Sequence, residues 1–218
     1  RIAELADDET LLVMVSDHGT KATTRRFIPA RVMADAGLTV FQKPLPSMKD
    51  HVPATKDEVL DQRIPFHAPP PDWSKTKAIM VGECYIWVNL KGRDPDGIVE
   101  PEDYESVRSE IIRVLYDYTD PETGIKPVML AVRREDALVF GLYGKMGERV
   151  GDIIYAINPQ YGRQHGPAWP THEIGIGSLR GLFLMAGPGV KKGDVLERKI
   201  NLVDVVPTLC HLAELPVP

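Results

Sequence analysis

An apolar run that ends in an acid, a histidine and a glycine constrains this chain more than any other feature. The run reads LLVMVSDHGT and begins at Leu11. Continuous apolar runs are typical of strands covered on both faces, as in a parallel sheet between helix layers. Ligands bind such sheets at the carboxyl ends of the strands. The sequence therefore predicts a strand over residues 10–16 and a functional edge at Asp17 and His18.

The Asp17-His18 pair offers a carboxylate oxygen and an imidazole nitrogen side by side. This donor set suits zinc or manganese. Gly19 allows the backbone to turn sharply behind the pair. An isolated Asp-His pair is more often a cap with a hydrogen-bonded imidazole, and that reading stays open on the pair alone.

A second histidine-bearing loop lies at 161–177, with the sequence YGRQHGPAWPTHEIGIG. His165 precedes a glycine, and His172 precedes a glutamate. Two strand-end loops with histidines beside glycine or acid favour a shared cleft. The alternative is that both histidines lie in a surface loop without a ligand role.

Periodicity along the rest of the chain predicts an α/β protein. A proline-rich stretch over 44–71 is longer than an ordinary loop. A strand, a helix and a strand then follow, which predicts a βαβ unit with a right-handed crossover. The predicted elements, in chain order, are a helix end over 1–8, the strand over 10–16, a helix over 24–36, a strand over 83–90, a helix over 101–118, strands over 128–132, 152–157 and 181–186, and a helix over 202–212.

Composition excludes several classes of protein. The net charge is -5 over 218 residues, and the only clusters of cations are short doublets, which argues against a nucleic-acid duplex as partner. No apolar run reaches the roughly 18 residues that a membrane span needs. The chain has two cysteines, Cys84 and Cys210, without metal-site spacing. Free thiols are compatible with the cytoplasm.

Several motifs in order resemble one known family. VMVSDHG, the loop with His165, LFLMAGPGVKKG and NLVDVVPTLCHLAELPVP are similar to the C-terminal half of the alkaline phosphatase superfamily, in its type I phosphodiesterase/nucleotide pyrophosphatase branch. The resemblance implies an alkaline-phosphatase-like sheet between helix layers, incomplete at the N-terminus, with an inserted βαβ subdomain. It divides the chain into core over 1–43, insertion over 44–150 and core again over 151–218.

The resemblance also implies a centre with two divalent metal ions, zinc or alternatively manganese. Asp17 and His18 would bind the ion that holds the nucleophile, and His165, or alternatively His172, would bind the other. The threonine or serine nucleophile has no counterpart here and is expected upstream of Arg1, so the fragment alone is expected to be inactive.

A small phosphate ester or nucleotide is the implied substrate. Alternatives are another activity of the superfamily, namely a sulfatase, a phosphonate hydrolase or a phosphoglycerate mutase, or a non-catalytic binding module with the same fold.

Overall fold

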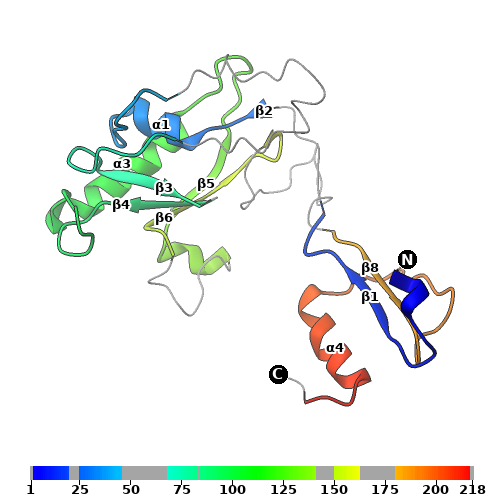
Figure 1. The fold of residues 1–218 in the computed structure, drawn as a ribbon. Coiled ribbons are helices and arrows are strands. Elements are labelled where there is room, and N and C mark those ends of the chain that lie inside the picture. Colours follow the sequence, from blue (N-terminus) through cyan, green and yellow to red (C-terminus); the bar gives the residue numbers. More distant parts are fainter. Residues whose placement is uncertain are drawn as a thin grey trace. The chain divides into compact units, whose positions relative to one another are not determined.

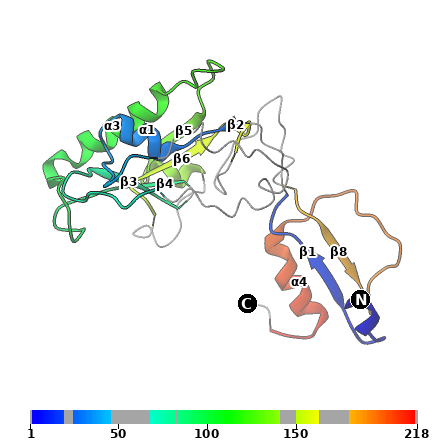
Figure 2. The same cartoon turned by 45° about the horizontal axis from the view of Figure 1, so that its top comes forward.

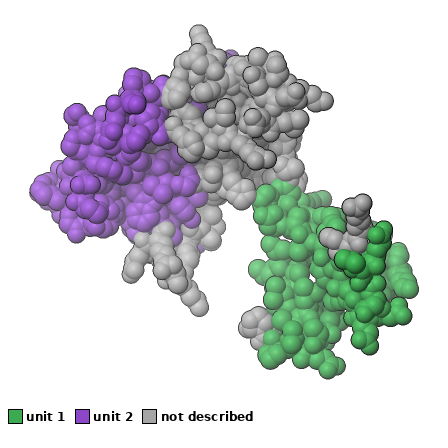
Figure 3. Space-filling model, in the orientation of Figure 1, with its two compact units in different colours: residues 1–22, 175–218 green, residues 23–174 purple. Residues whose placement is uncertain are grey.

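The computed structural model describes residues 2–19, 25–45, 68–82, 84–140, 150–162 and 180–216. The chain divides into two compact units, one formed by 1–22 with 175–218 and the other by 23–174. Figure 3 colours the two units separately. No helix within the described ranges combines the length and the apolar character needed to cross a bilayer.

The first unit is built on a two-stranded antiparallel ribbon. Strand β1 (Leu12–Val15) pairs with β8 (Phe183–Ala186), so that Val13 lies opposite Met185. Figure 1 shows this ribbon with the helix α4 (Val205–Leu212) beside it. The described part of this unit also contains the short 3₁₀ helices η1 (Ile2–Leu5) and η7 (Leu202–Asp204).

The expectation of a parallel partner for the first strand is wrong, because β1 and β8 run in opposite directions. The strand is also not covered on both faces, since Met14 and Val15 are 55% and 44% exposed. An apolar run records how well a segment suits burial, but it does not encode the direction of the neighbouring strand.

The second unit holds a four-stranded sheet in the order β3-β4-β6-β5, with every neighbouring pair antiparallel. The helices α1 and α3 lie along one face of this sheet, as Figures 1 and 2 show. The unit contains, in chain order, β2 (Arg25–Arg26), α1 (Pro29–Asp35), β3 (Ala78–Val81), β4 (Tyr85–Val88), η3 (Pro101–Asp103), α3 (Tyr104–Asp117), β5 (Val128–Arg133), η4 (Asp136–Phe140), β6 (Ile153–Ile157) and β7 (Tyr161–Gly162).

The strand-helix-strand unit β4-α3-β5 takes the form of a split βαβ motif. Because β4 and β5 each pair antiparallel with β6, they are parallel to one another with β6 between them. The sequence predicted the parallel pair but not the strand inserted in it. The sequence-based prediction grouped β6 with the closing segment of the chain. In the structure, this strand belongs to the four-stranded sheet.

Helix α3 shows why its sequence becomes a helix against a sheet. Acidic residues at its start suit the positive end of the helix dipole. Val107, Ile111 and Leu115 recur every four residues and are at most 6% exposed. This stripe buries its apolar surface against the sheet. The predicted helix over 101–118 is therefore confirmed, with a 3₁₀ turn as its first part.

Helix α1 begins later than its pattern suggested. Pro29 occupies its first turn, where a missing N–H costs nothing, and the two residues 25–26 form β2 instead. Gly37 ends the helix with a φ of +70°, a conformation that glycine adopts without strain.

The side chain of Asp152 is fully buried at the start of β6 and accepts several hydrogen bonds. The backbone N–H of Val88 and the hydroxyl of Tyr104 donate to it over 2.7 and 2.6 Å. Arg93 donates to it through two nitrogens at 2.8 and 2.9 Å, and Arg134 also pairs with it. This carboxylate joins β4, β6, α3 and the turn after β4.

Candidate metal site

Asp17 and His18 lie just beyond the end of β1, separated from it by Ser16. Their side chains are 77% and 45% exposed, so a ligand in solution can reach both. One carboxylate oxygen of Asp17 accepts the backbone N–H of His18 at 3.0 Å, which restricts the orientation of this carboxylate.

The imidazole of His18 is also oriented by the backbone of the next residue, Gly19. Its Nδ1–H donates to the carbonyl oxygen of Gly19 at 2.5 Å. Such a bond selects the tautomer that presents a lone pair on Nε2, the form that binds metals. This Nε2 lies 3.4 Å from Oδ2 of Asp17.

The separation of these two atoms fits ligands of a single cation. Two donors bound at about 2.0–2.1 Å to one tetrahedral zinc lie about 3.4 Å apart. A carboxylate oxygen with an imidazole nitrogen is also a donor set that zinc and manganese accept. The pair therefore passes the test of donor chemistry and spacing, although two ligands alone form only part of a site.

A close contact with β8 holds the end of β1 in place. The backbone N–H of Ser16 donates to the carbonyl of Leu182 at 2.9 Å, and the N–H of Leu182 donates to the Ser16 hydroxyl at 2.6 Å. A Cβ atom at Gly181 would lie 2.5 Å from that hydroxyl oxygen and 2.9 Å from the Ser16 carbonyl oxygen. Only glycine fits at this position without a shift of the strand end.

We expect Gly181→Ala to displace the residue next to Asp17 and to lower the free energy of unfolding of the first unit by about 1–3 kcal/mol. Chemical denaturation followed by circular dichroism measures this loss. The double variant Ser16→Ala/Gly181→Ala removes the hydroxyl that the new methyl group meets, and should recover part of it. Equal stability of Gly181→Ala and the unchanged chain would show that the contact is not tight.

The structure does not test whether the predicted loop histidines approach Asp17 and His18. His165 and His172 both lie outside the described residues, so their role stays a prediction. Within the ranges that the structure does describe, no group of three His, Cys, Asp or Glu side chains is arranged to hold a metal ion.

Two residues with structural roles were not predicted from the sequence. Gly181 was read only as the start of a strand, and its fit against Ser16 depends on a partner 165 positions away. Asp152 opens an apolar run, and only the positions of Arg93 and Arg134 reveal it as a buried charge centre.

Comparison with known families shows the family of the chain. Residues 1–176 match the model of the type I phosphodiesterase/nucleotide pyrophosphatase family. The chain belongs to this family. No curated protein and no solved structure matches it significantly.

Membership of the type I phosphodiesterase/nucleotide pyrophosphatase family makes the chain a phosphoric-ester hydrolase at the level of the family. Small phosphoesters or nucleotides are the substrates that this family implies. The matched range includes Asp17, His18, His165 and His172, whereas the two C-terminal motifs of the resemblance lie beyond it.

Proposed function

We propose that this chain is the C-terminal portion of a metal-dependent phosphodiesterase or nucleotide pyrophosphatase. The observation that carries the proposal is the 3.4 Å separation of Asp17 Oδ2 and His18 Nε2 at an exposed strand end. The family match over the same residues supports a role in phosphoester hydrolysis. Asp17 and His18 together bind one of two divalent ions, zinc or manganese.

The nucleophile is a threonine or serine that lies outside these 218 residues. This assignment rests on the order of motifs in the resemblance, in which the nucleophile precedes the Asp-His-Gly strand. When bound, divalent ions neutralise charge on the phosphoryl oxygens and lower the pKa of the attacking hydroxyl. Asp17 and His18 hold and orient an ion without exchanging protons with substrate. Metal binding should weaken at low pH, because a protonated imidazole cannot bind a metal.

We further propose that His165 is a ligand of the second ion, because the glycine after His165 matches the family pattern. In the complete gene product, His165→Ala should reduce diester hydrolysis far more than His172→Ala does. Steady-state rates with saturating metal measure the two losses. The reverse order would transfer the ligand role to His172.

The reaction class is tested with bis-(p-nitrophenyl) phosphate and the complete gene product. A phosphodiesterase hydrolyses this diester faster than p-nitrophenyl phosphate and p-nitrophenyl sulfate. Preference for the sulfate ester would favour a sulfatase. Failure to hydrolyse any of the three with zinc or manganese present would favour a non-catalytic module.

A further inference from the structure

A pocket of about 440 Å³ lies in the second unit, within residues 73–96. Ile79 and Trp87 form a cross-strand pair on its wall, with Val81 beside them. The adjacent pair, Ala78 and Val88, belongs to the core under the helices, and Val88 also forms part of the pocket lining. Because successive side chains of a strand alternate between faces, Ile79, Val81 and Trp87 line the sheet face away from α1 and α3.

Two tryptophans give the pocket its aromatic character. Trp73 lines it from the loop before β3 and is 40% exposed, so its ring is accessible to a ligand. The ring of Trp87 already interacts with cations, since the guanidinium carbons of Arg93 and Arg134 lie 5.4 and 5.8 Å from its centre. Both guanidinium groups are paired with the buried carboxylate of Asp152.

The rim of the pocket is acidic. Among the described residues that line it, the only ionised groups are the carboxylates of Asp94 and Asp96. Asp94 accepts hydrogen bonds from the N–H of Leu90 and from Arg93 through one of its oxygens. No described residue forms an ion pair with the carboxylate of Asp96, so this carboxylate is available to a ligand.

We propose that this pocket binds a small organic cation that carries a flat apolar body, of the arylalkylammonium class. The two indoles and the branched side chains of Ile79 and Val81 would cover the apolar body, and Asp96 would pair with the ammonium group. Arg93 already offsets the charge of Asp94, so the selectivity rests on Asp96. An anion would meet the carboxylate of Asp96, and a neutral analogue would leave it without an ionic partner. The pocket does not depend on the proposed hydrolase activity, because binding is measured without turnover.

Three probes of nearly equal shape separate these alternatives: benzylammonium, benzyl alcohol and benzoate. In isothermal titration calorimetry of the chain, benzylammonium should bind with a Kd of about 1 mM. Benzyl alcohol should bind at least about tenfold more weakly, and benzoate should not bind.

Variants place the binding in this pocket. Asp96→Asn keeps the shape of the side chain and should weaken benzylammonium binding about tenfold, as should Trp73→Ala. The matched control is Asp103→Asn, at an exposed aspartate of η3 that does not line the pocket, and it should change nothing. Equal binding of benzyl alcohol and benzylammonium, absence of benzylammonium binding, or an unchanged Kd in Asp96→Asn would each overturn the proposal.

Discussion

Replacing His18 by alanine in the complete gene product should lower diester hydrolysis by more than about 100-fold and remove one metal ion per chain. Loss of a residue that merely orients a metal ligand costs about 10–100-fold, so loss of a proposed ligand should cost more. Metal analysis by mass spectrometry and steady-state kinetics test both effects.

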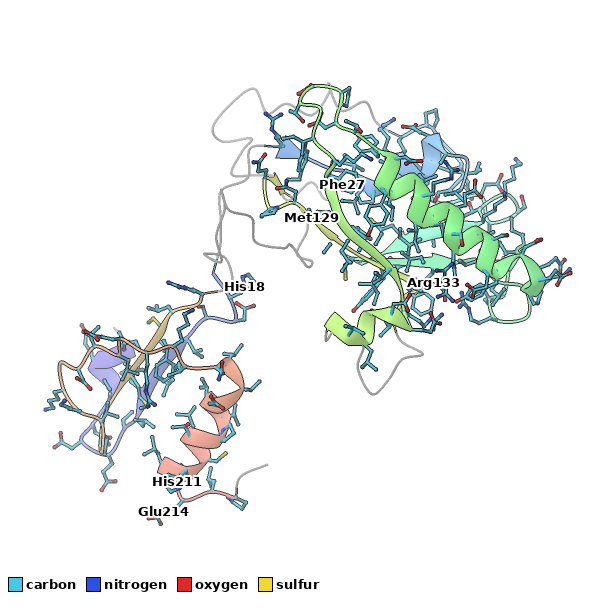
Figure 4. All side chains as sticks on the ribbon, turned by 180° about the vertical axis from the view of Figure 1, so that it is seen from behind. His18, Phe27, Met129, Arg133, His211 and Glu214 are labelled. Atoms are coloured by element: carbon cyan, nitrogen blue, oxygen red, sulfur yellow. The ribbon has the colours of Figure 1, made fainter. Side chains whose placement is uncertain are left out.

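His211→Ala is the matched control for this experiment. His211 is exposed in α4 and lies beyond the range that matches the family, and Figure 4 labels both histidines. The control should keep full metal content and activity. A His18→Ala variant with unchanged metal and rate would remove His18 from the metal site, and equal losses in both variants would indicate unfolding of the first unit.

Replacing Asp152 by asparagine should have the largest effect on stability, a loss of about 3–5 kcal/mol in the free energy of unfolding. The side chain is fully buried and pairs with both Arg93 and Arg134. Removal of its charge takes away the one fully buried carboxylate that both guanidinium groups share, and leaves them with the partly exposed Asp94 and Glu135. Urea denaturation monitored by tryptophan fluorescence reports the change, because Trp87 lies beside both arginines.

The control is Asp117→Asn, which breaks an exposed pair with Arg113 one helical turn away. Exposed pairs of this kind contribute about 0.3–0.5 kcal/mol. Asp152→Asn should therefore cost several times more than Asp117→Asn. Similar losses in the two variants would mean that the buried network adds no more than a surface ion pair.

The elements of this chain could be predicted well from local patterns. The stripe of Val107, Ile111 and Leu115 sets the position of α3, and the apolar runs mark β1, β5, β6 and β8. Strand β3 went unrecognised, because its four residues follow a charged, proline-rich stretch without an alternating pattern. Local periodicity reports which face is buried, so it identifies strands more readily than their partners.

The pairing of the strands needed information that local patterns do not carry. Nothing within LVMV shows that β8, more than 160 residues later, pairs antiparallel with it. The insertion of β6 between β4 and β5 likewise depends on a long-range contact.

The candidate site was predictable in part, because the potential metal ligands of an Asp-His-Gly sequence at a strand end can be identified from the sequence alone. The structure added the 3.4 Å separation of Asp17 and His18 and the support from Ser16 and Gly181. The pocket with Trp73 and Trp87 was not predicted. Its walls come from residues of different strands and loops, which the sequence alone does not bring together. The three-dimensional structure was needed to show that the described lining residues include no cation.

The metal content of the active gene product tests the proposed two-metal centre. We expect two zinc or manganese ions per chain, loss of diester hydrolysis when a chelator removes them, and recovery when either metal is restored. Full hydrolysis with less than one metal ion per chain would rule out a two-metal centre.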